Sequence, residues 1–229
     1  TADVTEMNVL CTGADILEDA AGEEIITETE LMNFMTYLSE KPMLAMKNDV
    51  GLKIYTAIRE TKKLINFDKQ YYYHARSKDK NAAPYIWGQM QKAPTGLPKA
   101  GRFNHVGKAH FYFADTKEGA ENEVRIHMSK EEKAKLEIQI MRLKTQKDIS
   151  LIDLSGSFRR GYKTFLKYIR FGLSGDTSQM PRVYLIPSFV SDCCKDCGIE
   201  GIKYYGGAGY SNYVSWEDGY FTFDGNILK

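Results

Sequence analysis

The chain has 229 residues, of which 43% are hydrophobic and 27% are charged. This composition is typical of a globular protein with a full hydrophobic core, and it excludes disordered and collagen-like chains. Lysine and arginine number 31 and aspartate and glutamate number 30, so the formal net charge is only +1. Proteins that bind duplex nucleic acid usually carry a strong basic excess, so such a partner is not favoured.

The sequence shows no pattern that directs a chain into or across a membrane. Residues 1–25 lack the basic and apolar regions of a secretory signal. No stretch approaches the roughly 18 apolar residues of a membrane-spanning helix. We therefore expect a cytoplasmic protein.

Three of the four cysteines lie close together, at Cys193, Cys194 and Cys197, and the fourth is Cys11. Such crowding does not suit a disulfide framework. Cys194 and Cys197 form a single C-x-x-C, but tetrahedral zinc needs two further ligands, which only distant Cys11 and scattered histidines offer. We favour buried thiols at a helix end over a zinc site or a redox pair, and we predict no metal.

The first quarter of the chain is predicted to be helical. Apolar residues recur at helical spacing across residues 27–66, and Pro42 interrupts the pattern. From Tyr71 the sequence becomes rich in aromatic and β-prone residues with glycine and proline between them. We predict a helical N-terminal segment over residues 1–66 and a second domain over residues 67–229.

The second domain is predicted to mix strands and helices. Residues 110–114 form a compact apolar strand, and Thr116 then caps a helix that carries Ala120 and Val124 on one stripe. The other predicted strands are residues 135–143, 149–154, 201–205, 212–216 and 220–223, with the last two joined at the Gly219 turn. The other predicted helices are the basic, amphipathic residues 159–170 and a helix from Pro187 to Cys197 that Gly198 ends. The basic residues of 159–170 are interpreted as a solvated face rather than a polyanion site.

The densest group of polar residues is the glycine-flanked loop Gly101-Arg-Phe-Asn-His-Val-Gly107. A guanidinium beside backbone donors suits a phosphate, so Arg102 is a candidate anion clamp, the alternative being a turn arginine paired with a surface carboxylate. Asn104 is expected to shape the loop. Eleven positions separate Tyr112, at a predicted strand end, from Glu123 on the next helix, which lets both face one cleft.

These residues resemble the signature of the RES-domain family, which has a G-R-[FW]-N loop, a Y-[LF]-A strand and an A-x-x-E helix. Further blocks resemble the family in the same order along the chain. They are Tyr71-Tyr-Tyr-His-Ala-Arg76, Tyr184-Leu-Ile-Pro-Ser, Gly198-Ile-Glu-Gly-Ile-Lys-Tyr204 and Asn212-Tyr-Val. The resemblance spans about Tyr71 to Trp216, and the order of the blocks makes it specific.

The resemblance implies an α+β fold of the ADP-ribosyltransferase type, with a split sheet around an NAD cleft, behind the helical N-terminal segment. It implies an intracellular toxin that cleaves the bond between nicotinamide and ribose in NAD, passing ADP-ribose to water, phosphate or a protein. It also implies a cognate antitoxin as partner. A catalytically degenerate NAD-binding module and an RNA-acting toxin are the alternatives.

The resemblance also suggests roles for individual residues. Glu123 stabilises positive charge on the ribose, Arg102 and Arg76 hold the pyrophosphate, and Tyr112 faces the nicotinamide. His74 stands where the family usually has its first arginine, and it or Tyr73 is expected to bond a ribose or amide group. The family's serine is missing or displaced to Ser211, and the glycine run 206–209 is an alternative source of donors. Glu121 is interpreted as solvated.

Overall fold

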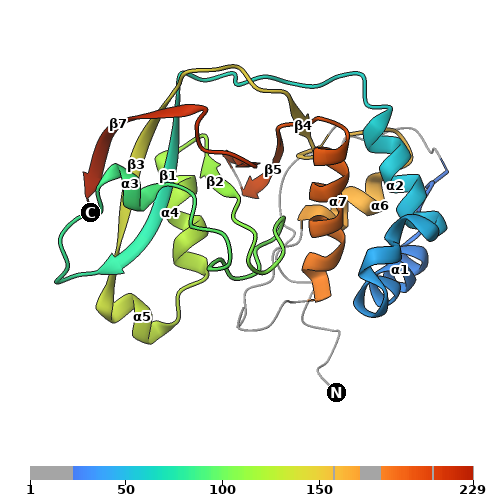
Figure 1. Cartoon of the computed structure of the whole chain (residues 1–229), viewed down its shortest axis with the longest axis horizontal. Helices are drawn as coiled ribbons and strands as arrows, with labels where there is room; N and C mark the ends of the chain where they lie inside the picture. Colours follow the sequence, from blue (N-terminus) through green and yellow to red (C-terminus); the bar gives the residue numbers. More distant parts are fainter. Residues whose placement is uncertain (1–22, 157, 171–181, 208, 229) are drawn as a thin grey trace.

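The computed structural model describes residues 23–156, 158–170, 182–207 and 209–228. Within them the chain forms a seven-stranded sheet with helices at both ends (Figure 1). The strands are β1 (Tyr71–Asp79), β2 (Phe111–Ala114), β3 (Leu136–Thr145), β4 (Leu151–Asp153), β5 (Gly201–Gly207), β6 (Tyr210–Ser215) and β7 (Phe221–Leu228). The helices are α1 (Glu28–Glu40), 3-10 helix η2 (Pro42–Lys47), α2 (Asp49–Arg59), α3 (Trp87–Met90), α4 (Lys117–Ile126), α5 (Lys130–Lys135), α6 (Lys163–Arg170), 3-10 helix η3 (Arg182–Tyr184) and α7 (Leu185–Asp196).

The N-terminal helices follow the predicted pattern but end earlier. A capping box between Thr27 and Glu30 starts α1, and the chain turns at Pro42 before α2. The helix prediction to residue 66 is wrong beyond Arg59. There the chain is extended, because Ile65 N donates to Leu151 O at 2.9 Å and pairs with the strand region instead.

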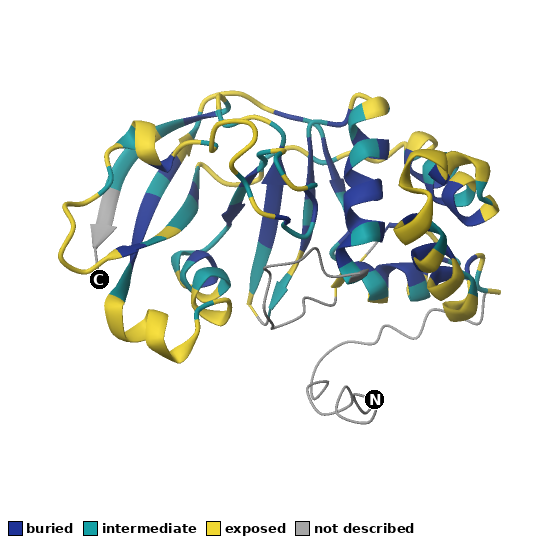
Figure 2. Ribbon diagram, turned by 60° about the horizontal axis from the view of Figure 1, so that its bottom comes forward, coloured by how far each residue is buried: buried dark blue, intermediate teal, exposed yellow. Residues whose placement is uncertain are grey.

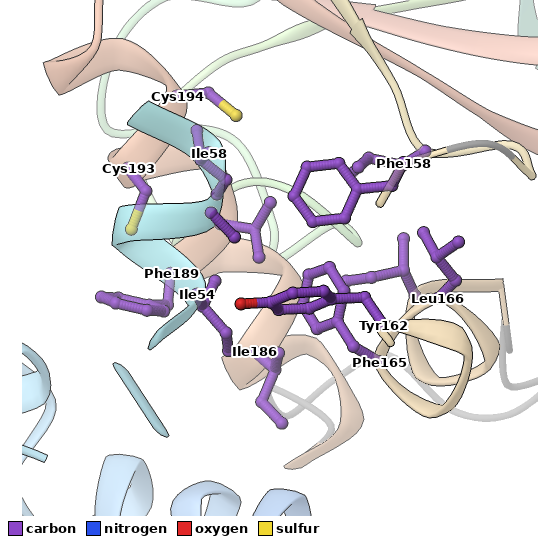
Figure 3. Packing of buried hydrophobic residues seen from close by; sticks show 14 of the residues in the cluster. Ile54, Ile58, Phe158, Tyr162, Phe165, Leu166, Ile186, Phe189, Cys193 and Cys194 are labelled. Atoms are coloured by element: carbon purple, nitrogen blue, oxygen red, sulfur yellow. The ribbon is translucent and has the colours of Figure 1, made fainter. Parts of the chain in front are cut away.

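The N-terminal helices share one hydrophobic core with the rest of the chain. Phe34 of α1 packs edge-on against Phe189 of α7, with ring centroids 5.4 Å apart. Ile54 of α2 lies in the same cluster as Phe165 of α6 (Figure 3). Figure 2 shows buried residues along the strands and α7, and exposed residues on the outer surfaces of α1 and α2. The helical segment therefore helps to cover the sheet rather than forming a core of its own.

The thiols of Cys193 and Cys194 belong to this apolar cluster (Figure 3). Burial raises the pKa of both thiols, so the thiolate that a zinc ion or a redox reaction requires is disfavoured. Cys197 is partly exposed, and Cys11 lies outside the described residues. Among the described residues no cluster of cysteine, histidine and acidic side chains has the geometry of a metal site.

The sheet is nearly divided between β1 and β2. Its strand order is β4-β5-β6-β2-β1-β3-β7, and β1 and β2 are paired at one residue pair, Tyr73 with Ala114. In contrast, β1 pairs with β3 along its whole length. The two groups of strands therefore form one continuous sheet that opens on either side of the Tyr73–Ala114 pair.

The expected hairpin of the last two strands is not formed. β6 is already paired with β5 on one side and with β2 on the other, so neither of its edges is free for β7. β7 instead pairs with β3, and Phe221 enters an aromatic cluster with Tyr72 and Phe113. The prediction of strands at 212–216 and 220–223 holds, but their pairing was wrong.

Two helix starts also differ from the sequence prediction. α7 begins at Leu185, so that Pro187 occupies its first turn, where a proline removes no helical hydrogen bond. α6 begins at Lys163 rather than residue 159. Gly198, with φ of 72°, ends α7 as expected. In the part of the chain that the structure describes, no helix is both long and apolar enough to cross a membrane.

Candidate functional site

A cavity of about 380 Å³ lies where the sheet is nearly divided. Tyr73 and Ala114, the residue pair that joins the two groups of strands, both line it. The other described lining residues come from β1, β2, β5, β6, α4 and the turn after it, α5, the η3 end and the loop before β2. The separation of the strands therefore creates the space, and several elements supply side chains to it.

One row of residues across four strands lines the cavity. Tyr73 of β1 is paired with Ala114 of β2, Ala114 with Asn212 of β6, and Asn212 with Tyr204 of β5. All four residues line the cavity. The row places a small side chain and an amide between two tyrosines, which leaves room for a flat ligand group.

The loop Gly101–Asn104 is held in one shape by its own side chains. Phe103 is fully buried, and the Tyr112 hydroxyl accepts from Phe103 N and donates to Asn104 Oδ1, both at 2.9 Å. The Asn104 amide donates to the carbonyls of Lys99 and His105. A Cβ at Gly101 would lie 2.3 Å from Asn104 Oδ1, so this position requires glycine. Asn104 shapes the loop, as predicted.

Gly101 and Arg102 are the loop residues that line the cavity, and Arg102 is the one with a side chain. Its guanidinium lies over the Tyr204 ring, with Cζ 5.1 Å from the ring centroid. Its Nη1 is buried and has no hydrogen-bond partner among the residues that the structure describes. Arg102 is also the one arginine or lysine among the described lining residues. A guanidinium with a buried, unused donor is able to bind an anion.

Glu123 reaches the cavity from α4. The Thr116 hydroxyl accepts from Gly119 N at 3.0 Å and caps this helix, as the sequence predicted. The Tyr210 hydroxyl donates to Glu123 Oε1 at 3.3 Å. Burial and then the negative charge of Glu123 raise the pKa of Tyr210 to about 12, so the phenol keeps its proton at neutral pH.

The Tyr210 ring lies in a space that glycines provide. A Cβ would lie 2.5 Å from Tyr210 Cδ2 at Gly119, 2.4 Å from Cε2 at Gly206 and 2.8 Å from Cε1 at Gly207. Real Cβ atoms do not approach so closely, so each glycine is needed for the ring to occupy this place. In the described part of the run 206–209, Gly206 and Gly207 thus accommodate a side chain, which explains their presence without phosphate contacts.

The structure brings five of the seven sequence-predicted site residues to this cavity. They are Tyr73, His74, Arg102, Tyr112 and Glu123. Arg76 and Ser211 are not among the described lining residues. The Arg76 guanidinium donates to the Gln89 carbonyl and lies over the Tyr85 ring. Ser211 N donates to Asp115 Oδ1 at 2.9 Å.

His74 does not supply a second positive charge to the cavity. It shares a 2.7 Å hydrogen bond with the Tyr112 carbonyl, which fixes Nδ1 as the donor. Burial lowers the pKa of His74, so the ring is neutral at physiological pH. Nε2 is left as an acceptor. His74 therefore places no cation where the family usually has its first arginine, and Arg76 is not among the described lining residues.

The interpretation of Glu121 as solvated is wrong. Its side chain is only 12% exposed and forms an ion pair with Arg125 one helical turn later. The 100° turn per residue does place Glu121 and Glu123 on different sides of α4, as expected. Glu121 therefore has a structural partner, while Glu123 faces the cavity.

Sequence reasoning missed Tyr210 and gave Asn212 no role of its own. Two other tyrosines, Tyr184 and Tyr204, line the cavity with Asn212, and burial raises the pKa of both. The Arg102 and Glu123 charges act on both phenols in opposite directions. Glycines next to an aromatic residue, as in Gly206-Gly207 before Tyr210, were the available signal that a ring lies over the backbone.

No protein-family model and no curated protein matches the sequence. The fold is similar to that of a chain in the crystal structure of the M. tuberculosis MbcT–MbcA toxin–antitoxin complex, with a TM-score of 0.50 and 14% sequence identity. The similarity covers 77% of this chain and 91% of that chain. At this identity the comparison establishes a shared mixed α/β fold.

Proposed function

We propose that the chain is an NAD-consuming toxin of the RES-domain type, with an ADP-ribosyltransferase-like cleft, that cleaves the bond between nicotinamide and ribose. The observation that carries the proposal is that Arg102 and Glu123 line the same cavity. Arg102 has a guanidinium donor without a partner among the described residues, and Glu123 accepts a hydrogen bond from the Tyr210 hydroxyl. These are the two charges that the family resemblance assigns to pyrophosphate binding and to charge stabilisation.

The chemistry requires both charges. When the glycosidic bond of NAD breaks, its electron pair leaves with the pyridine nitrogen, and positive charge develops on the ribose. A carboxylate such as Glu123 stabilises that charge. A guanidinium such as Arg102 binds phosphate oxygens and holds the dinucleotide in place.

The leaving group needs no proton. Nicotinamide departs from a pyridinium as a neutral molecule, so the reaction does not call for a general acid. A neutral His74 is compatible with this, because its Nε2 can accept a hydrogen bond but has no proton to give. The acceptor of ADP-ribose is water, phosphate or a protein side chain.

The fold similarity to a chain of a toxin–antitoxin complex supports the toxin role. By the same reasoning we propose that an antitoxin protein binds this chain and blocks the cavity. An RNA-acting toxin has little support. The formal net charge is near neutral, whereas RNA binding relies on basic residues. The Arg170 guanidinium of the basic helix already donates to the Ser155 carbonyl at 2.6 Å.

Incubation of the purified chain with NAD, followed by mass spectrometry, tests the proposal. Free nicotinamide is the expected product, together with ADP-ribose in water or its phosphate ester when phosphate is present. Transfer to a protein adds the mass of ADP-ribose to that protein. Retention of intact NAD by the chain would instead identify a binding module.

The toxin role is tested separately in cells. Induced expression in a bacterial host should deplete NAD and stop growth, and Glu123→Gln should relieve both effects at the same expression level. Growth arrest with an unchanged NAD pool would contradict the proposed reaction.

A further inference from the structure

Asn212 lies in the middle of the row that lines the cavity, and its side-chain amide is not satisfied. The residue is 2% exposed, and neither Oδ1 nor Nδ2 has a hydrogen-bond partner among the described residues. The other buried asparagine, Asn104, uses both amide atoms in hydrogen bonds. The two residues thus differ sharply, although both are buried.

An unsatisfied buried amide is costly. Each buried polar atom without a partner destabilises a fold by about 1–3 kcal/mol, and an apolar side chain of the same shape avoids this cost. Asn212 lies between Tyr213, which is buried, and the half-buried Ser211, in a strand where leucine fits the secondary structure. Packing alone gives no reason for an asparagine at this position.

The position of the amide points to a ligand. Asn212 lines the same cavity as Arg102 and Glu123, and its cross-strand neighbours in the row are Ala114 and Tyr204. Ala114 has no side-chain polar atom to bond the amide, and Tyr73 and Tyr204 lie at the two ends of the row. A flat ring that carries its own amide would supply the missing partners.

We propose that Asn212 recognises the carboxamide of the nicotinamide ring, with Oδ1 accepting from its NH₂ group and Nδ2 donating to its carbonyl. This inference rests on the proposed function, because NAD supplies the nicotinamide. A side-chain amide is suited to the task because it offers one donor and one acceptor side by side, which match a second amide.

Ligand entry requires a side chain to move. Both amide atoms are covered in the ligand-free chain. The Tyr210 ring and Asn212 both lie close to Gly206. A Cβ added at Gly206 would be 2.4 Å from Tyr210 Cε2 and 2.9 Å from Asn212 Cγ. The Tyr210 ring therefore packs on the Gly206 side of Asn212, and the carboxamide reaches Asn212 from the cavity side.

The test compares ligands that differ only in the amide. Calorimetry on the wild-type chain measures binding of nicotinamide and of 3-methylpyridine, which has the same ring without the amide. We expect nicotinamide to bind about ten-fold or more tightly, and Asn212→Leu to remove this preference. Loss of a paired amide explains the change, since leucine has a similar shape and no polar atom.

A stability measurement separates recognition from a structural role. Asn212→Leu should keep or raise the midpoint of thermal unfolding, because it removes two unsatisfied atoms. Asn104→Leu is the matched control and should lower the midpoint, because its amide bonds the loop. A fall of the Asn212→Leu midpoint like that of the control would overturn the inference.

The binding result also separates this inference from the proposed function. If the wild-type chain releases nicotinamide from NAD but Asn212→Leu keeps the full amide preference, the role of Asn212 is refuted and the function stands. If the chain does not consume NAD but prefers nicotinamide through Asn212, the function is refuted and the amide site stands. If wild type shows no preference for the amide, the inference is overturned.

Discussion

The Tyr210 hydroxyl donates a hydrogen bond of 3.3 Å to Glu123 Oε1, which joins the β5–β6 hairpin to helix α4. The ring of Tyr210 is held in place by close packing on Gly119, Gly206 and Gly207. A carboxylate with a fixed donor on one oxygen keeps the other oxygen available for a ligand. This relationship determines how substitutions around the cavity should behave.

Replacing Glu123 with glutamine should lower the rate of nicotinamide release by about 10²- to 10³-fold, by analogy with the loss of other single charge-stabilising groups. The substitution keeps the shape and removes the negative charge. Steady-state assays with NAD measure the effect, and circular dichroism checks the fold.

Glu118→Gln is the matched control for this change. Glu118 lies on the same helix, is exposed and does not line the cavity, so its substitution should leave turnover unchanged. Glu121 is a poorer control, because it is paired with Arg125. Full activity of a folded Glu123→Gln protein would remove Glu123 from the mechanism.

Tyr210→Phe should reduce kcat by about five-fold with little change in KM. The substitution keeps the packed ring and removes one hydrogen bond, which at this length is worth about 1 kcal/mol. Tyr205→Phe serves as control, since Tyr205 is 44% exposed and lies outside the cavity lining. An equal loss in both variants would show that the hydroxyl of Tyr210 has no special role.

Local patterns in the sequence were sufficient to predict most elements and part of the site. The loop from Gly101 to Asn104, the strand that follows and the Thr116 cap form from contacts between near neighbours, so spacing alone identifies them. These segments carry Arg102 and Glu123, which explains why both were found.

Long-range contacts explain what the sequence did not reveal. β7 pairs with β3 because both edges of β6 are occupied, and no local pattern encodes that occupancy. Arg76 is not among the lining residues because Tyr85, in the following loop, and Gln89, in α3, hold its guanidinium. Tyr210 reaches Glu123 from 87 residues away, so only the folded chain reveals the pair.

Arg102→Ala should weaken NAD binding by about ten-fold or more, and Arg102→Lys should restore little of it. A planar guanidinium can bind two phosphate oxygens at once and can stack on Tyr204, whereas an ammonium does neither. Calorimetry on the Glu123→Gln background measures binding without turnover. Unchanged affinity in Arg102→Ala would exclude the guanidinium from the phosphate site.

Stability should fall as the pH drops from about 6.5 towards 3. Burial, and then the Lys195 ammonium 2.6 Å from Nε2, lower the pKa of His110 to about 3. The unfolded chain binds a proton near pH 6.5 and the folded chain does not, so acid favours unfolding over this interval. Burial lowers the pKa of His74 as well and acts in the same direction.

His110→Gln tests the contribution of His110 to this acid sensitivity. Glutamine stays neutral, so the variant should lose less stability than wild type when urea unfolding is compared at pH 7 and pH 5. Some sensitivity should remain because His74 is still present. An identical pH dependence in the two proteins would mean that His110 is protonated in the folded chain.

Gly119→Ala should destabilise the fold and impair catalysis, although alanine in a helix is normally favoured over glycine by about 1 kcal/mol. The added Cβ would lie 2.5 Å from Tyr210 Cδ2 and would push the ring away from Glu123. Gly88→Ala in α3 is the control, since the Cβ position of Gly88 has no neighbour within 4 Å.

A double substitution isolates the contact between Gly119 and Tyr210. In a Tyr210→Ala background the ring is gone, so Gly119→Ala should cost less free energy of unfolding than it does in the wild-type chain. Urea unfolding of the four proteins gives this coupling energy directly. Equal costs in both backgrounds would show that Gly119 is required for a reason other than the Tyr210 ring. The packing of Tyr210 on the glycines would then not be what orients Glu123.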